Sequence, residues 1–193
     1  RDALLGRLGS DTDLDFATNA QPEQIVELLG GWAEAVWDVG IRFGTVGARI
    51  DGREVEITTY RSESYDAPSR KPEVAFGDNL ADDLARRDFT MNAMAVTLPS
   101  MEFVDLFDGI AALAAKRIRT PGTAQSSFDD DPLRMMRAAR FASQLDAIVD
   151  TDVVDAMSAQ AERISIVSAE RIREEFSKIV MSNHPRVGLT LLV

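Results

Sequence analysis

The pattern of apolar residues changes near residue 120, and this change most restricts how the chain can fold. Before it, strand-like stretches with apolar-polar alternation lie between helix-like stretches; after it, almost every stretch has helical spacing. Strands followed by a run of helices are typical of α+β proteins. We therefore expect an α+β fold, with a small mixed head containing a β-sheet over residues 1–118 and an all-helical neck over residues 119–193.

Strands are expected at four places in the head, the last of them over residues 102–106. Residues 13–18 alternate like a half-buried strand, and two β-rich runs follow at residues 41–50 and 54–60. The dipeptide Asp51-Gly52 separates these two runs, and Asp-Gly favours the positive φ angles of a tight hairpin turn. Residues 61–78 are polar and contain two prolines, which predicts a loop.

Helices are predicted from amphipathic spacing and from start signals. A proline in the first turn marks one start at Pro22. Another start is expected at Asp129-Asp130-Asp131-Pro132, because acids favour the positive end of the helix dipole. The expected helices are residues 3–8, 22–29, 80–87, 129–145, 151–163 and 168–181, with one more after Pro185.

Composition excludes few functions. The 32 acidic and 21 basic residues give a net charge of −11, the wrong sign for binding phosphates by charge alone. Bound divalent cations would reverse the charge locally, so a nucleic-acid partner is not excluded. The absence of cysteine excludes disulfides and thiolate metal sites. No apolar run of about eighteen residues and no signal-peptide pattern are found, so we expect a cytoplasmic protein without membrane contact.

Three carboxylates form the first candidate site. Asp13 and Asp15 are two residues apart in an expected strand, so their side chains share one face. Glu56 lies in another strand and would complete a set of hard oxygen ligands for Mg²⁺, able to support an in-line displacement at phosphorus. Glu54 shares the face of Glu56, so spacing does not choose between the two. Solvated acids on an exposed strand are the structural alternative.

Two further patterns suggest nucleotide binding. In Arg86-Arg-Asp-Phe-Thr-Met-Asn-Ala93, arginine suits phosphate and the Asp and Asn side chains suit ribose hydroxyls; two arginines at a helix C-terminus are the alternative. Asp131 and Arg134 are three residues apart and share a helix face. Asp accepts from the exocyclic amine of cytosine or adenine while Arg donates to the ring, so the pair would refuse uracil and guanine. A capped helix start with an ion pair is the alternative.

Taken in order, several segments resemble successive motifs of class II tRNA nucleotidyltransferases and bacterial poly(A) polymerases. They are Asp13-Leu-Asp-Phe-Ala-Thr18, Phe43-Gly-Thr-Val46, Glu56-Ile-Thr-Thr-Tyr-Arg61, Arg86-Arg-Asp-Phe-Thr-Met-Asn-Ala93, Asp105-Leu-Phe-Asp-Gly109, Asp130-Asp-Pro-Leu-Arg-Met-Met-Arg-Ala-Ala-Arg-Phe141 and Ser168-Ala-Glu-Arg171. The resemblance covers nearly the whole chain and implies a nucleotidyltransferase head. It also implies that the family's opening strand and glycine turn precede Arg1, and that its body and tail follow Val193.

The resemblance implies a role for each matching position. Asp13 and Asp15 would bind the metal, Glu56 would be a further catalytic acid, and Arg1 would contact the nucleotide. The other implied nucleotide-binding residues are Arg87, Asp88 and Asn92 for the ribose and triphosphate, Asp131 and Arg134 for the base, and Arg137 as a support of the pocket.

The expected reaction is the addition of CCA to the 3′ end of tRNA from CTP and ATP. A poly(A) polymerase is the nearest alternative, although the run Gly40–Val46 resembles the CCA enzymes more. Enzymes that add only CC or only A stay open, as does a non-catalytic RNA-binding module. The retained carboxylates disfavour the module, and the base-recognising pair disfavours transfer to a protein or small molecule.

Overall fold

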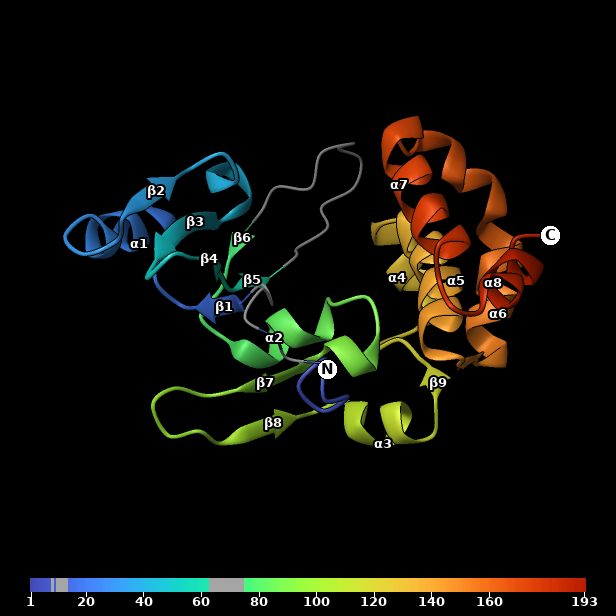
Figure 1. The fold of residues 1–193 in the computed structure, drawn as a ribbon. Helices are drawn as coiled ribbons and strands as arrows, with labels where there is room; N and C mark the ends of the chain where they lie inside the picture. The colour runs from blue at the N-terminus through green and yellow to red at the C-terminus, as the bar shows by residue number, and fades with distance from the viewer. Residues whose placement is uncertain (8, 10–13, 63–74) are drawn as a thin grey trace. The chain divides into compact units, whose positions relative to one another are not determined.

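The chain folds into two compact units. The computed structural model describes residues 1–7, 9, 14–62 and 75–193. The N-terminal unit holds Asp2–Arg86, and the C-terminal unit holds Arg87–Val193 together with Arg1. The fold is α+β as expected, with a β-sheet in the first unit and most of the helices in the second (Figure 1). The head–neck boundary expected near residue 118 stays a prediction.

The N-terminal unit is built on a four-stranded sheet with the order β1-β4-β3-β2. β1 runs parallel to β4, whereas the β2–β3 and β3–β4 pairs are antiparallel. The φ angles of Asp51 and Gly52 are 50° and 73°, which confirms the hairpin turn predicted from Asp-Gly. The strands of this sheet are β1 (Leu14–Thr18), β2 (Ala35–Trp37), β3 (Thr45–Ile50) and β4 (Arg53–Thr59).

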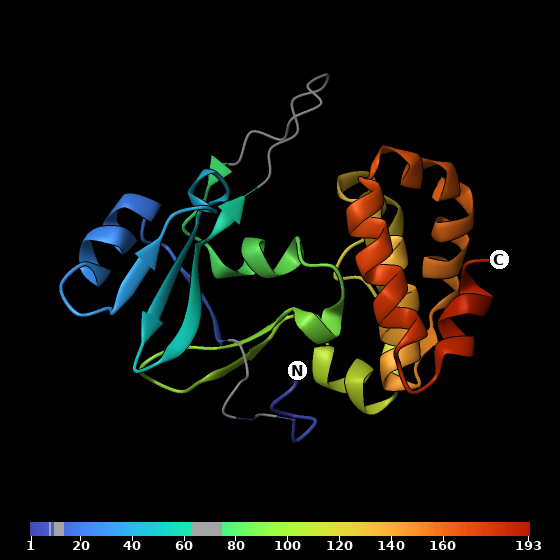
Figure 2. The same ribbon diagram turned by 45° about the horizontal axis from the view of Figure 1, so that its top comes forward.

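One face of this sheet is covered by α1 (Pro22–Leu29), as Figure 2 shows. Ile25 and Leu29 of the helix are buried with Val46, Ala48 and Val55 of the sheet. Because side chains alternate along a strand, the residues between these apolar positions lie on the opposite face. That opposite face carries the acidic residues of β1 and β4.

Two expectations for the N-terminal unit are wrong. Residues 3–6 form turns rather than part of the expected helix 3–8, because Gly6 takes a φ of 67°, outside the helical region; residue 8 lies outside the described residues. The expected strand over residues 41–50 begins only at Thr45; Ile41–Phe43 form the 3-10 helix η1, which ends at Gly44 with a φ of 79°. The expected loop contains the short strands β5 (Arg61–Ser62) and β6 (Ala75–Phe76), and the helix α2 (Leu80–Ala85) follows.

The C-terminal unit is mainly helical and has its own apolar core. The aromatic rings of Phe89 and Phe141 meet edge to face at 5.7 Å inside it. α5 packs against both α7 and α8. The elements are η2 (Thr90–Asn92), β7 (Met94–Val96), β8 (Phe103–Asp105), α3 (Gly109–Ala114), β9 (Arg117–Ile118), α4 (Ala124–Asp130), α5 (Leu133–Leu145), β10 (Ile148–Val149), α6 (Thr151–Gln160), η3 (Ala161–Ile166), α7 (Ala169–Val180) and α8 (Pro185–Leu191).

The predicted helix start at Asp129–Pro132 is wrong. Asp129 and Asp130 end α4, a helix that the sequence did not predict, and α5 begins only at Leu133. Asp131 lies between the helices in an extended conformation, with φ −142° and ψ 102°. The following proline explains this break, because a residue that precedes proline is pushed out of the helical region.

The later helices follow the predictions closely. α6 ends at Gln160 and the chain continues as the 3-10 helix η3, while α7 and α8 lie within a residue or two of the expected positions. Among the described residues, no helix is long and apolar enough to cross a membrane.

Candidate active site

The parallel pairing of β1 and β4 brings two of the predicted catalytic carboxylates together. Asp15 and Glu56 are register partners in this pair, so their side chains leave the sheet side by side on the same face. Both residues are exposed. Asp13, the third predicted carboxylate, lies outside the described residues.

The register also separates Glu56 from Glu54, which spacing alone could not do. The Glu54 carboxylate accepts a 2.8 Å hydrogen bond from the guanidinium of Arg49, its cross-strand neighbour. This contact with Glu54 raises the pKa of Arg49 above its ordinary value. Glu56 is therefore the glutamate that lies next to Asp15, while Glu54 is engaged in an ion pair.

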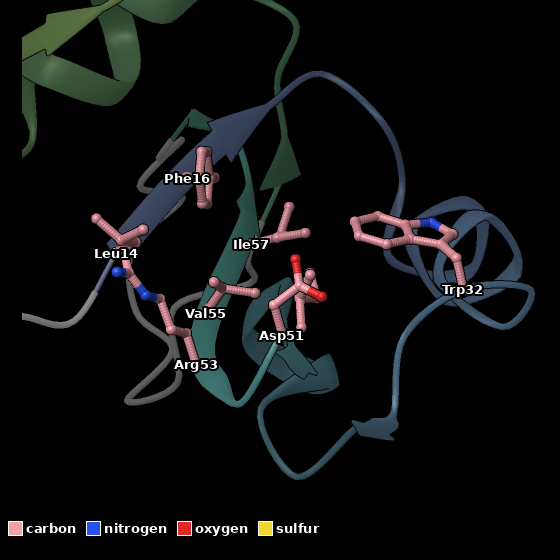
Figure 3. A pocket seen from close by; sticks show the side chains of 8 residues that line it. Leu14, Phe16, Trp32, Asp51, Arg53, Val55 and Ile57 are labelled. Carbon is pink, nitrogen blue, oxygen red and sulfur yellow. The ribbon is translucent and has the colours of Figure 1, made fainter. Parts of the chain in front are cut away.

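A hollow of about 640 Å³ lies on the other face of the sheet and is distinct from this carboxylate pair (Figure 3). Its apolar lining includes Leu14, Phe16 and Ile57, which alternate with Asp15 and Glu56 along β1 and β4. Within the described residues, no group of three or more acidic, histidine or cysteine side chains is close enough to hold a metal ion. Of the three predicted catalytic carboxylates, Asp15 and Glu56 are thus described, and of the two predicted metal ligands, Asp15 is described.

Asp88 is the centre of a polar network in the C-terminal unit. One of its carboxylate oxygens accepts from the Phe89 backbone N–H at 2.8 Å and from the Asn92 amide at 3.0 Å. The other accepts from Nε of Arg137 at 2.7 Å and forms an ion pair with Nη2 of the same group at 2.5 Å. The Asn92 side-chain oxygen accepts in turn from Arg1 at 2.9 Å. Four of the predicted nucleotide-binding residues therefore form one connected network.

Three guanidinium groups surround the ring of Phe141 beside this network. Those of Arg1, Arg137 and Arg140 lie 4.9, 5.6 and 4.0 Å from the ring centroid, within the range of cation–π attraction. Burial lowers the pKa of Arg140 below its ordinary value, and its 2.6 Å bond to Glu175 opposes that shift. Arg87 begins this unit and is partly buried.

Asp131 and Arg134 lie on either side of the start of α5. One oxygen of Asp131 accepts from the Leu133 backbone N–H at 3.1 Å, and the other is 3.0 Å from the guanidinium of Arg171 on α7. Arg134 donates to the Ser127 hydroxyl at 2.9 Å and lies 3.9 Å from Asp130. The expectation that Asp131 and Arg134 share a helix face is therefore wrong, because Asp131 precedes α5. Arg171 of α7 contacts Asp131, whereas Ser127 of α4 contacts Arg134.

These residues belong to segments that known proteins share. Residues 1–119 match the family described as "Poly A polymerase head domain", and residues 148–193 match "Probable RNA and SrmB- binding site of polymerase A". The chain belongs to the poly A polymerase head-domain family. This result agrees with the resemblance to class II tRNA nucleotidyltransferases and bacterial poly(A) polymerases.

Relatives within the poly A polymerase head-domain family include CCA-adding enzymes. The chain is 40% identical to the CCA-adding enzyme of Lactiplantibacillus plantarum over 194 aligned residues, which cover 100% of this chain and 46% of that enzyme. The chain thus spans about half the length of the curated relatives that it matches.

Solved structures of CCA-adding enzymes have the same fold. The Bacillus stearothermophilus CCA-adding enzyme in complex with CTP matches with a TM-score of 0.87 and 36% identity, over 99% of this chain and 45% of that one. The Thermotoga maritima CCA-adding enzyme complexed with tRNA(CCA) matches with a TM-score of 0.75 and 27% identity, over 98% and 43% of the two chains.

Two residues of this family member were given no role by sequence reasoning although they position predicted site residues. Arg171 holds Asp131, and Ser127 accepts from Arg134. The segment Ser168-Ala-Glu-Arg171 had been identified as a family motif, so a signal for Arg171 was present. Ser127 had no comparable signal, because the helix that contains it was not predicted.

Proposed function

We propose that this protein adds C, C and A in turn to the 3′ end of tRNA, using CTP and ATP. The observation that carries the proposal is the exposed, in-register Asp15–Glu56 pair in a chain that aligns along its whole length with CCA-adding enzymes. Complexes of such enzymes with CTP and with tRNA support the same substrates for this protein.

In each addition the 3′-hydroxyl oxygen of the RNA forms a bond to the α-phosphorus of the nucleotide. The bond from that phosphorus to the bridging oxygen of the β-phosphate breaks, pyrophosphate leaves, and the hydroxyl proton passes to solvent. The RNA is longer by one nucleotide, and no redox change occurs.

A divalent metal ion, Mg²⁺ in our proposal, fits the donor set at the carboxylates. Asp15 and Glu56 offer hard oxygen ligands on one exposed face, and Asp13 is proposed as a further metal ligand. When bound, such an ion would neutralise the charge of the phosphates and favour ionisation of the attacking hydroxyl. The adjacent strands fix the spacing between Asp15 and Glu56 before any ligand binds.

The network around Asp88 is proposed to bind the sugar and triphosphate. Both oxygens of the Asp88 carboxylate are already engaged, one by the Phe89 N–H and the Asn92 amide and the other by the Arg137 guanidinium. Asp88 therefore acts through its neighbours: it orients the Asn92 amide, which keeps one N–H for a ribose hydroxyl, and it aligns Arg137. Arg1 and Arg87 are proposed to contact phosphate oxygens, which suit a guanidinium fork.

Asp131 and Arg134 are proposed to recognise the incoming base. Ionised Asp131 can only accept and Arg134 can only donate, which matches the amine and the ring nitrogen of cytosine and of adenine. Arg171 and the Leu133 N–H hold the Asp131 carboxylate on two sides, so its orientation is set before the nucleotide arrives. Uracil and guanine reverse the donor and acceptor, which would place an acceptor against Asp131 and a donor against Arg134, at about 1–3 kcal/mol for each base group left unpaired.

Polyadenylation is the second candidate, favoured by the family description over residues 1–119, which names poly A polymerase. Incubating the full-length protein with Mg²⁺ and tRNA that lacks CCA separates the two. We expect three nucleotides and then a stop with CTP and ATP, and no extension with UTP or GTP. Long A tails on unrelated RNA without use of CTP would favour polyadenylation, and a product short by one or two nucleotides would indicate CC- or A-only addition.

Asp15→Asn tests the role of the carboxylates, because it keeps the shape of an exposed side chain and removes its charge. We expect it to lower the rate of transfer at least about a hundredfold while tRNA binding and circular dichroism stay unchanged, because electrostatic groups at the reacting centre contribute most in the transition state. A wild-type protein that binds tRNA but transfers no nucleotide would instead indicate a non-catalytic RNA-binding module.

A further inference from the structure

One row of side chains crosses all four strands of the sheet. Trp37 on β2 pairs with Gly47 on β3, Gly47 pairs with Glu56 on β4, and Glu56 pairs with Asp15 on β1. Register partners point to the same face. Trp37 therefore shares the face of the catalytic carboxylates, and sequence reasoning gave it no role.

The indole of Trp37 extends along this row towards the carboxylates. A Cβ atom placed on Gly47 would lie 1.9 Å from Nε1, 2.2 Å from Cε2 and 2.7 Å from Cδ1 of the Trp37 ring. The pyrrole part of the indole therefore fills the space above Gly47, and only glycine can stand beneath it. Gly47 is buried as a result, although Trp37 itself keeps part of its surface exposed.

The position of the ring brings it close to the reacting centre. Neighbouring strands are about 4.8 Å apart, so the ring over Gly47 is about one strand from Glu56 and two strands from Asp15. Within the described residues, the indole N–H donates to no acceptor. An aliphatic side chain would be enough to fill the space above a glycine. Trp37 in addition presents an aromatic surface and an unused N–H donor beside two carboxylates.

We propose that Trp37 is a stacking platform for the 3′-terminal base of the RNA that receives the nucleotide. The inference rests on the proposed function, because the RNA terminus must reach the carboxylates for its 3′-hydroxyl to attack. The incoming base is assigned to Asp131 and Arg134, which leaves the terminal base of the RNA to be held by another group.

The chemistry of successive additions favours stacking over hydrogen bonding at this position. The terminal base of the RNA is the discriminator base before the first addition and cytosine before the next two. A contact that serves all three steps must tolerate different bases. Stacking on an aromatic ring does so, because every base has a π-face.

The test compares two RNAs on the full-length protein with Mg²⁺ and CTP. One is tRNA ending at the discriminator base, and the other is the same tRNA with an abasic ribose at its 3′ end. For the wild-type protein we expect kcat/KM to be about fivefold lower or more with the abasic RNA, because stacking one base on an aromatic ring strengthens binding by about that factor. Without nucleotide, the abasic RNA should also bind more weakly, with a higher Kd than the RNA that ends at the discriminator base.

The decisive variant combines Trp37→Ile with Gly47→Val. Two β-branched residues restore the filled surface and suit a strand, but they remove the aromatic ring. We expect this variant to extend both RNAs with kcat/KM values within about twofold of each other. Trp37→Phe, which needs no change at Gly47, should keep most of the wild-type preference.

An equal abasic penalty in the wild type and in the double variant would overturn the stacking role, as would no penalty in the wild type. Should the double variant fail to fold, Trp37→Leu with Gly47 retained gives the same comparison. A wild-type protein that extends neither RNA refutes the proposed function instead, and the Kd comparison still tests the platform.

Discussion

Replacing Asp88 by asparagine tests whether the network around that residue holds the C-terminal unit together. The substitution keeps the shape of the side chain. Its carbonyl oxygen can still accept from the Phe89 N–H and the Asn92 amide, but its NH₂ group then faces the guanidinium of Arg137. Two donors oppose each other where an ion pair had been.

The cost follows from the contacts that are lost. Nε and Nη2 of Arg137 lie 2.7 and 2.5 Å from the Asp88 carboxylate, and a hydrogen bond to a charged group contributes about 1.5–3 kcal/mol. Arg137 is 34% exposed, so water replaces part of the loss. We expect Asp88→Asn to lower the free energy of local opening by about 2–3 kcal/mol, which makes the equilibrium constant for opening about 30 to 150 times larger.

Amide hydrogen exchange measures this local opening directly, and it does not require that the whole protein unfolds in a two-state transition. The amides to follow are those of residues 89–93, which include the η2 bonds from Asn92 to Phe89 and from Ala93 to Thr90. Asp129→Asn is the matched control, because Asp129 and its partner Arg163 are 51% and 42% exposed and 3.6 Å apart. An exposed pair of this kind should change exchange by about twofold or less.

The reasoning is refuted if exchange over residues 89–93 rises no more in Asp88→Asn than in the control. In the proposed enzyme, the same substitution should also weaken discrimination between ribo- and deoxyribonucleotides, because Asn92 and Arg137 lose their common anchor. Normal sugar discrimination with increased exchange would mean that the network stabilises the fold without ordering the sugar site.

Two further predictions concern the helices. Gly188→Ala should lower the free energy of unfolding by about 1–3 kcal/mol in thermal denaturation, because the new Cβ would lie 2.2 Å from the Ser143 hydroxyl oxygen. Gly122→Ala is the control and should be nearly neutral, because no atom lies within 4 Å of the Cβ it would add. Arg171→Met should lower kcat/KM for CTP and ATP alike by about two- to fivefold, since the exposed pair with Asp131 contributes up to about 1 kcal/mol; equal rates for variant and wild type would show that Asp131 needs no external support.

Local signals predicted much of the fold. The Asp51-Gly52 turn formed with both residues at positive φ, and Pro22 stands at the start of α1, because each depends on backbone preferences of one or two residues. The predicted helix at Asp129–Pro132 failed for a reason that is also local. Two rules compete there, and the restriction that proline places on Asp131 outweighs the preference of acids for a helix start.

The candidate site depends on pairings that spacing cannot reveal. Asp88 and Arg137 are separated by 49 residues, and nothing in either segment names the other as its partner. Spacing left Glu56 and Glu54 equivalent, and the register of two parallel strands that are not adjacent in sequence places Glu56 beside Asp15. The resemblance to a family predicted the members of these groups, whereas their mutual contacts required coordinates.

The contacts also support the proposal that this acidic chain binds an anionic triphosphate. The guanidinium groups of three arginines lie around Phe141: Arg137 is paired with Asp88, Arg140 is paired with Glu175, and Arg1 donates to the side-chain oxygen of Asn92. The carboxylates do not cancel the site; they fix the direction of the guanidinium groups, which an isolated arginine could not maintain at the same entropic cost. The net charge of −11 is a property of the whole chain. The proposed binding of a triphosphate depends instead on the nearby guanidinium groups and their orientation, because exposed charges more than about 10 Å away are largely screened at physiological salt.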